Sequence, residues 1–204
     1  MVSQLGTRLA QPLSSRDHVR GPRSAAVSLV EYGDFECPYC RAAVDIVNAL
    51  RQALGDQLSF TFRHFPMRDV HPHAQHAAEV AEAAAAQGRF WDMHDRLFAG
   101  QAALDDDSLL RFARELSLDT ARVSDELTSH TYAERVEEDR RSAIASGATG
   151  TPTFFIDGSR YDGSVSLLKM LATIRELHPD LSIAETLPPS PRIPRIRWPR
   201  EEQP

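Results

Sequence analysis

The stretch VEYGDFECPYC, residues 30–40, holds Cys37 and Cys40, the two cysteines of the chain, separated by two residues. Just upstream, residues 26–32 are rich in β-branched and aromatic side chains, which predicts a short buried strand. Just downstream, Pro38 suits the first position of a helix, because its missing N–H would have no partner there. The cysteine pair is therefore predicted at a strand-to-helix junction, with Cys37 at the start of the helix.

A cysteine in this position is favoured as a thiolate. Backbone N–H groups and the helix macrodipole stabilise an anion at a helix N-terminus, so Cys37 should ionise more readily than a free thiol. Cys40 lies one turn further on, close enough to attack a mixed disulfide formed on Cys37. Asp34 and Glu36 flank the pair, and we expect both carboxylates to point to solvent, where screening weakens their effect on the thiol pKa.

Outward from the cysteines, the hydrophobic pattern predicts the order of the elements. The helix that begins at Pro38 has one apolar face and ends at Gly55. A second strand follows at residues 57–63, and a long run of consecutive helices comes next. The chain closes with a strand at 153–156, the hairpin turn Asp157-Gly158, a return strand and a last helix over 164–177. This order predicts an α/β fold in which a helical domain is inserted into a small mixed sheet.

The same pattern sets the predicted domain boundaries. Residues 21–66 and 149–178 form the sheet domain, and residues 67–148 form the inserted helical domain. Residues 1–20 are predicted to be a flexible N-terminal arm. Residues 187–204, rich in proline and arginine, are predicted to be a disordered tail.

Pro152 stands immediately before the strand at 153–156. Proline interrupts a strand ladder, so its presence at a strand start needs a reason. A cis Thr151–Pro152 bond would kink the chain beside the sheet and would expose the backbone of Thr151 for pairing with an extended substrate segment.

The composition limits the classes of function. The formal net charge of −6 over 204 residues does not favour a nucleic-acid surface, which usually needs a concentrated basic patch. No apolar run approaches the ~20 residues that span a bilayer. Residues 1–16 lack the apolar core of a secretory signal, so we expect a cytoplasmic protein without membrane or nucleic-acid partners. In a reducing compartment, two neighbouring cysteines favour catalysis or metal binding over a structural disulfide.

Five motifs together resemble the DsbA-like family of thioredoxin-fold oxidoreductases, and in particular the bacterial subgroup that also occurs fused to sodium/proton antiporters. The likeness covers about residues 17–178, and its motifs are VEYGDFECPYC at 30–40, RHFP at 63–66, HPHA at 71–74, GRFWDMH at 88–94 and GTPTFFIDG at 150–158.

The resemblance implies a thioredoxin-like fold, β-α-β … β-β-α, and disulfide exchange with protein or peptide thiols without a bound cofactor, together with an unidentified redox partner. It implies that Cys37 is the nucleophile, Cys40 the resolving thiol and Pro152 the cis-proline, and that Pro38, Tyr39 and Thr151 contact substrate. Glu31 matches a buried acidic position beneath the active site of that family. A carboxylate there could relay a proton to or from Cys40, its pKa would be raised by burial, and Arg63 could approach it from the next strand.

Two other functions are open at this stage. The cysteine pair could be half of a zinc site, completed by two of the histidines His64, His71, His73, His76 and His94, because structural zinc takes four ligands. For His94, on an apolar helix face, a hydrogen-bonded core residue is the favoured interpretation. The chain could also be a non-enzymatic chaperone or adaptor that uses the fold to dock peptides.

Overall fold

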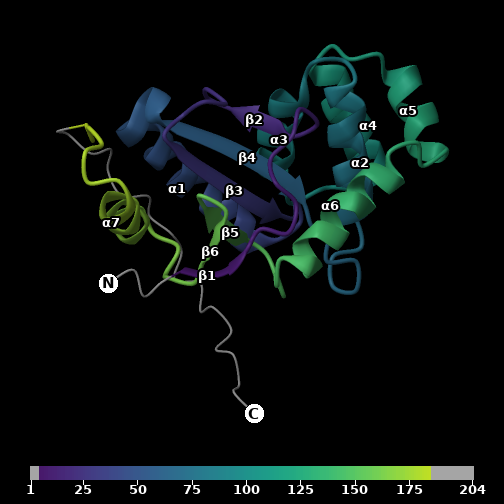
Figure 1. Cartoon of the computed structure of the whole chain (residues 1–204). Helices are drawn as coiled ribbons and strands as arrows, with labels where there is room; N and C mark the ends of the chain where they lie inside the picture. Colours follow the sequence, from purple (N-terminus) through teal and green to yellow (C-terminus); the bar gives the residue numbers. More distant parts are fainter. Residues whose placement is uncertain (1–4, 185–204) are drawn as a thin grey trace.

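A computed structural model describes residues 5–184 and has a six-stranded sheet at its centre, in the order β1-β6-β5-β3-β4-β2 (Figure 1). The strands are β1 (Leu5–Arg8), β2 (His18–Arg20), β3 (Val27–Gly33), β4 (Leu58–His64), β5 (Thr153–Ile156) and β6 (Ser159–Tyr161). The helices are α1 (Pro38–Leu54), α2 (Ala74–Ala85), α3 (Phe90–Ala99), α4 (Asp106–Glu115), α5 (Thr120–Thr128), α6 (Ala133–Ala145) and α7 (Leu167–Leu177), with a 3-10 turn η1 at Gly55–Gln57.

The parallel pair β3 and β4, connected by α1, forms the middle of the sheet. Every residue of β4 and all but Ser28 of β3 are buried, as expected for strands covered on both faces. The amphipathic helix α1 places Ala43, Ile46 and Leu50 on the sheet and ends at Gly55, whose φ of 55° suits glycine. The predicted βαβ unit is confirmed, with β5 pairing antiparallel to β3 on the other side.

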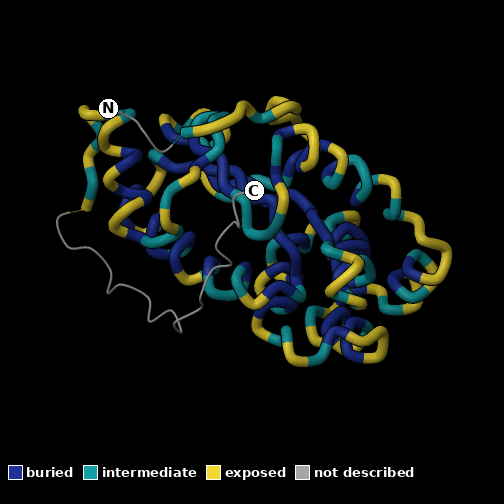
Figure 2. Tube along the Cα trace, turned by 90° about the horizontal axis from the view of Figure 1, so that it is seen from below, coloured by how far each residue is buried: buried dark blue, intermediate teal, exposed yellow. Residues whose placement is uncertain are grey.

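Helices α2–α6 gather at one end of the sheet (Figure 1). They do not form a core of their own, because one cluster of buried side chains runs from β3, β4 and α1 into α2, α3, α4 and α5. The dark, buried stretches of Figure 2 continue from the sheet into these helices. A second, smaller cluster joins Tyr32 and Phe155 to Ala143 of α6 on the opposite face of the sheet. Within residues 5–184, no helix combines the length and the apolar character needed to cross a bilayer.

The two outermost strands come from the segment that was predicted to be a flexible arm. β1 pairs with β6 and β2 pairs with β4, so residues 5–8 and 18–20 belong to the sheet. The buried Arg63 stabilises the segment between β1 and β2, because its Nε and Nη2 donate to the Asp17 carboxylate at 2.7 and 3.1 Å. These strands escaped prediction because they are short and polar. Residues 1–4 and the predicted tail at 187–204 lie outside the described residues.

The expected approach of Arg63 to Glu31 is wrong. In the parallel register Tyr32 is aligned with Arg63 and Glu31 with Phe62. Aligned residues point to the same face of a sheet and their chain neighbours to the other. Arg63 therefore lies beside Tyr32, to whose hydroxyl it donates at 3.0 Å, while Glu31 faces α1.

Candidate active site

Cys37 is the residue that begins α1. Its backbone is extended, with φ −73° and ψ 121°, and its carbonyl accepts the first hydrogen bond of the helix from the Arg41 N–H at 3.1 Å. Cys37 and Cys40 are free thiols, and both are buried, with exposures of 3% and 0%. The strand-to-helix junction predicted from sequence thus places both thiols at the first turn of α1.

The loop before β5 lies against the Cys37 thiol. The Cys37 Sγ lies 3.3 Å from the Thr151 carbonyl oxygen, to which the thiol donates when it is protonated, and the Thr151–Pro152 peptide bond is cis. Strand pairing explains this contact between distant parts of the chain. Because β5 is antiparallel to β3, with Thr153 opposite Tyr32, the start of β5 meets the end of β3 from which the cysteine loop departs.

The two thiols differ in acidity. A hydrogen bond from the Cys40 thiol, together with the Thr151 side chain and the N–H groups of Tyr39 and Cys40, outweighs burial and lowers the pKa of Cys37 to about 6. Burial raises the pKa of Cys40 well above its ordinary value, and the neighbouring Cys37 raises it further. At neutral pH the negative charge therefore resides on Cys37.

This difference gives a measurable pH profile. The alkylation rate of Cys37 by iodoacetamide should follow a single titration with a midpoint near 6 instead of the ordinary 9.0. Because the thiolate is the reactive form, the rate at pH 7 should exceed that of a thiol of ordinary pKa and equal thiolate reactivity by roughly a hundredfold. Mass spectrometry of the labelled peptide identifies the modified cysteine, and a midpoint above 8 would contradict the assignment.

Glu31 lies beneath the thiols, on the face of β3 that α1 covers. It is 3% exposed, and its Oε1 has no hydrogen-bond partner among the described residues. Burial is the main reason that its pKa is raised to about 8, and the charge of Cys37 adds to this effect, whereas a hydrogen bond with Cys40 opposes it. A cavity of about 10 Å³, lined by Glu31, Asn48, His94 and Asp95 among others, adjoins this carboxyl. That volume is roughly what one water molecule needs.

The expectation that Asp34 and Glu36 point to solvent is wrong. The Asp34 side chain is fully buried, and its carboxylate accepts hydrogen bonds from the Glu36 N–H, the Met67 N–H and the His71 Nδ1, each at 2.8 Å. Glu36 accepts a hydrogen bond from the His73 N–H at 2.7 Å. Apart from the Glu36 N–H, the donors come from the loop between β4 and α2, so the local sequence around the cysteines did not reveal them. The two carboxylates attach this loop to the cysteine loop.

Gln101, in the connection between α3 and α4, contacts the cysteine loop, and the sequence did not predict this contact. Its side-chain Nε2 donates to the carbonyl oxygens of Phe35 and Cys37, at 2.8 and 2.9 Å. Gln101 belongs to none of the motifs quoted above, and no local pattern marks it. The helical block thus contacts the main chain of the cysteine loop directly.

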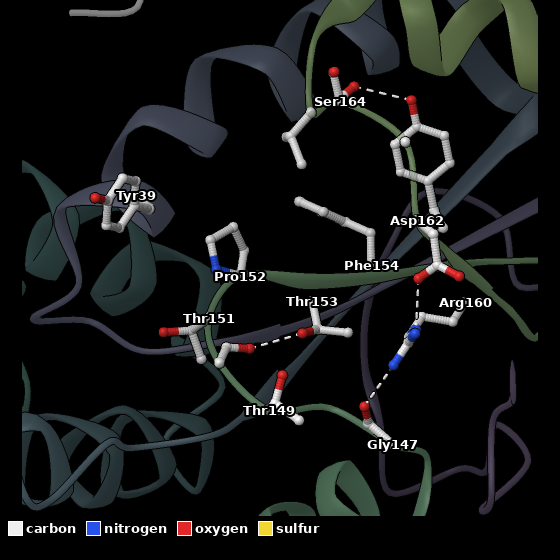
Figure 3. Close-up of a pocket in the computed structure, with 14 residues that line it drawn as sticks. Tyr39, Gly147, Thr149, Thr151, Pro152, Thr153, Phe154, Arg160, Asp162 and Ser164 are labelled. Atoms are coloured by element: carbon white, nitrogen blue, oxygen red, sulfur yellow. Dashed lines mark hydrogen bonds and ion pairs between the residues drawn. The ribbon is translucent and has the colours of Figure 1, made fainter. Parts of the chain in front are cut away.

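A groove of about 580 Å³ opens along the loop before β5, whose Thr151 contacts Cys37 (Figure 3). Two of the predicted substrate contacts, Tyr39 and Thr151, line it at one end together with Pro152, the predicted cis-proline, and residues 160–165 line it at the other. Pro38, the third predicted substrate contact, is exposed at the start of α1 but is not part of the lining. Arg160 is held in the groove wall by Asp162 and by the Gly147 carbonyl, both at 2.6 Å.

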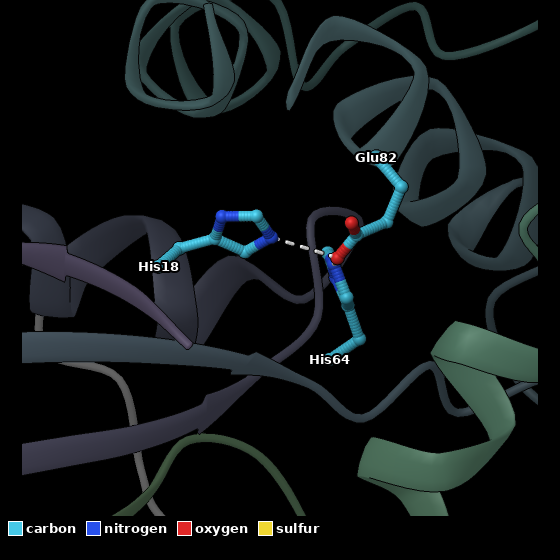
Figure 4. Close-up of side chains that lie close together, drawn as sticks. All are labelled: His18, His64 and Glu82. Carbon is cyan, nitrogen blue, oxygen red and sulfur yellow. Dashed lines mark hydrogen bonds and ion pairs between the residues drawn. The ribbon is translucent and has the colours of Figure 1, made fainter. Parts of the chain in front are cut away.

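The histidines do not join the cysteines. Among the described residues, His18, His64 and Glu82 form the one group of three or more His, Cys, Asp or Glu side chains that lie close enough together to hold a metal ion (Figure 4). Both imidazole Nε2 atoms lie 2.9 Å from one Glu82 oxygen, and the Arg135 Nε lies 3.8 Å from the same atom. The hydrogen bonds and charge of His18 and His64 outweigh burial and hold the pKa of Glu82 well below its usual range, so this group links the sheet to α2 without a metal ion being required.

The other histidines of the zinc hypothesis have separate partners. His71 pairs with Asp34, and His76 pairs with Asp106 at 2.7 Å. His94 is buried among aromatic rings and pairs with Asp95 at 2.8 Å, as expected for a hydrogen-bonded core histidine. The His73 N–H binds Glu36.

Comparisons with known proteins agree with this geometry. Residues 13–176 match the family model described as Thioredoxin. A Na(+)/H(+) antiporter of Salinispora arenicola is 48% identical over 161 residues, covering 78% of this chain and 24% of the relative. An antiporter of Herminiimonas arsenicoxydans is 46% identical over 158 residues, covering 78% and 25%. The chain therefore spans about a quarter of the length of these curated relatives.

Solved structures show the same fold. BdbD from Bacillus subtilis, in its oxidised form, superposes with a TM-score of 0.73 at 22% identity, covering 84% of this chain and 97% of BdbD. A thioredoxin-like oxidoreductase from Silicibacter pomeroyi has a TM-score of 0.72 at 25% identity, covering 81% and 94%. The α-DsbA1 protein of Wolbachia pipientis has a TM-score of 0.71 at 21% identity, covering 84% and 94%.

Proposed function

Because the chain belongs to the thioredoxin family and has a thioredoxin fold with a helical insertion, we propose that it is a DsbA-like protein thiol–disulfide oxidoreductase in which Cys37 attacks and Cys40 resolves. The observation that supports this proposal most strongly is the pair of free thiols at the first turn of α1. The outer thiol is acidified and the inner thiol is kept protonated. A nucleophile and a resolving group need this division of acidity.

The proposed cycle transfers two electrons. When the Cys37–Cys40 disulfide is present, a substrate thiolate attacks the Cys37 sulfur, and Cys40 leaves with the electron pair of the broken S–S bond. A second substrate thiolate then attacks the substrate sulfur of the mixed disulfide and releases Cys37 as a thiolate. The substrate dithiol becomes a disulfide, and the protein is left reduced. In the opposite direction Cys37 attacks a substrate disulfide, and Cys40 then releases the reduced substrate.

Glu31 is proposed to handle the proton of Cys40. Cys40 is fully buried, so the proton that it loses or gains during resolution needs a nearby acceptor or donor. A pKa near 8 lets Glu31 hold or release a proton close to neutral pH, and the adjoining water-sized cavity supports an exchange of that proton with water.

The groove is proposed to hold an extended segment of the substrate protein. Its lining by Tyr39, Thr151 and Pro152 supports this role, because a peptide seated there would present its own cysteine to Cys37. Pro38 would contact substrate from the exposed start of α1. The partners are protein or peptide thiols and disulfides and a redox partner not yet identified, and no bound cofactor is needed. A cytoplasmic location stays a prediction.

Equilibration of the purified chain with glutathione buffers tests the proposed function. We expect a two-electron transition between the dithiol and the Cys37–Cys40 disulfide, and exchange with a model peptide well above the glutathione background. A reduction potential near the −120 mV of DsbA would indicate that the protein donates disulfides to its substrates. A potential near the −270 mV of thioredoxin would indicate that it reduces them. Exchange no faster than background in both directions would refute the proposal, as would near-stoichiometric zinc bound through the two thiols.

A further inference from the structure

We propose that Gln101 is a positioning residue for Cys37, through which the helical block sets the acidity of the attacking thiol. The inference rests on the proposed redox role of Cys37 and adds a group that does not touch the reacting sulfur. Gln101 acts through the main chain, because its side-chain amide donates to the carbonyls of Phe35 and Cys37.

The two carbonyls belong to buried residues, since Phe35 is 1% and Cys37 3% exposed. Buried carbonyls need hydrogen-bond donors, and losing one leaves an acceptor cut off from water. The Cys37 carbonyl also accepts the first hydrogen bond of α1, from the Arg41 N–H. The amide of Gln101 therefore fixes both the loop that enters the helix and the first turn of the helix.

The remainder of the cysteine loop is attached elsewhere. The Asp34 carboxylate binds the Met67 N–H and the His71 imidazole, and the Asp34 carbonyl accepts from the Cys37 N–H at 3.2 Å. The carboxylate bonds hold the loop where it leaves β3, and Glu36 holds its middle by accepting from the His73 N–H. Gln101 holds its far end, next to the sulfur, so its removal should disturb the cysteine turn while the Asp34 attachment persists.

The acidity of Cys37 depends on this turn. The N–H groups of Tyr39 and Cys40 are among the groups that favour the thiolate, and they reach Sγ only while Cys37 keeps its extended backbone at the helix start. A loop that shifts so that water can reach the two carbonyls would move Sγ away from these donors. The reduced form would lose part of its stabilisation, so the disulfide form would be favoured.

A graded series at position 101 tests this inference. Gln101→Met keeps the length of the side chain and removes the donor, whereas Gln101→Glu places a carboxylate near the two carbonyls and the thiolate. We expect the pKa of Cys37 to increase in the order Gln, Met, Glu. For Met the acid dissociation constant should fall by about threefold. A threefold change in the thiol–disulfide equilibrium corresponds to a reduction potential about 14 mV lower, at 29.6 mV per tenfold.

Gln57→Met is the matched control. Gln57 also donates through its Nε2 to two backbone carbonyls, those of Leu54 and Ser182, but at the far end of α1. Both Met variants should lose thermal stability, so stability alone does not separate them. Only the variants at position 101 should change the midpoint of the alkylation profile, the thiolate absorbance and the potential.

The outcomes separate this inference from the proposed function. If Gln101→Met loses stability and leaves the Cys37 midpoint and the potential at the values of the Gln57→Met protein, Gln101 is merely structural and the inference is wrong. Alkylation and thiolate absorbance require no substrate. A wild-type chain that fails to exchange disulfides would therefore refute the proposed function, while the order Gln, Met, Glu would still test the positioning role.

Discussion

Replacing Cys37 with serine is expected to reduce disulfide exchange with a model peptide to the rate of the uncatalysed reaction. A serine hydroxyl stays protonated at neutral pH and forms no S–S bond, so both the attack and the covalent intermediate are lost. The substitution changes one atom at a residue that is 3% exposed, and we expect the fold to persist. The rate is measured with a fluorescent peptide disulfide, and circular dichroism confirms folding.

Cys40→Ser is the matched control for this prediction, because it makes the same change one turn along α1. This variant should still attack and should then accumulate a mixed disulfide with the peptide, visible as an adduct by mass spectrometry, since no thiol remains to resolve it. A chaperone or adaptor would behave differently, with both variants binding unfolded peptide as the wild type does. Exchange by the Cys37→Ser protein at the wild-type rate would exclude the proposed chemistry.

The fold could be predicted where local signals were strong. A run of β-branched and aromatic residues predicted β3, proline and glycine predicted the ends of α1, and the turn at Asp157-Gly158 predicted the pairing of β5 with β6. Each signal lies within a few residues of the element that it specifies. The cysteine pair could be predicted for the same reason, because its spacing and its position at a helix start are both local features of the sequence.

The parts of the site that could not be predicted from the sequence depend on contacts between distant segments of the chain. Asp34 looked like a solvent-exposed acid, but its hydrogen-bond donors are supplied by Met67 and His71, more than thirty residues further along the chain. Gln101 lies 64 residues from Cys37. Arg63 was predicted to approach Glu31 because their two strands were expected to be neighbours. The register of β3 and β4 instead places the Arg63 side chain on the opposite face of the sheet from Glu31. Such pairings depend on how the elements pack, which the sequence pattern does not specify.

Glu31→Gln is expected to raise the free energy of unfolding above pH 7, by on the order of 3 kcal/mol, because each unit of pKa shift is worth about 1.4 kcal/mol. In the folded protein the pKa of Glu31 is raised to about 8 from an ordinary 4.5. Between these values the folded chain keeps a proton that the unfolded chain releases. The contribution of this group to stability is therefore fully present below pH 4.5 and is lost as the pH rises through 8. Glutamine does not titrate, so the gain should grow over this interval and then level off.

Urea unfolding of the reduced proteins from pH 4 to 9 measures this difference. Part of the shift comes from the charge of Cys37, so the gain should be smaller when the Cys37–Cys40 disulfide removes that charge. The same substitution should slow resolution of the mixed disulfide, because the amide that replaces the carboxyl group cannot exchange the proton of Cys40.

Glu82→Gln provides a control of opposite sign. Glu82 is also buried, but hydrogen bonds and charge from His18 and His64 lower its pKa, so its carboxylate stabilises the fold at neutral pH and that contribution is lost as the pH falls. The two substitutions make the same carboxyl-to-amide change at buried sites, and one should stabilise the protein while the other destabilises it. If Glu31→Gln lowered stability at pH 8 as Glu82→Gln does, Glu31 would be a paired structural carboxylate and could not serve as the proton relay for Cys40.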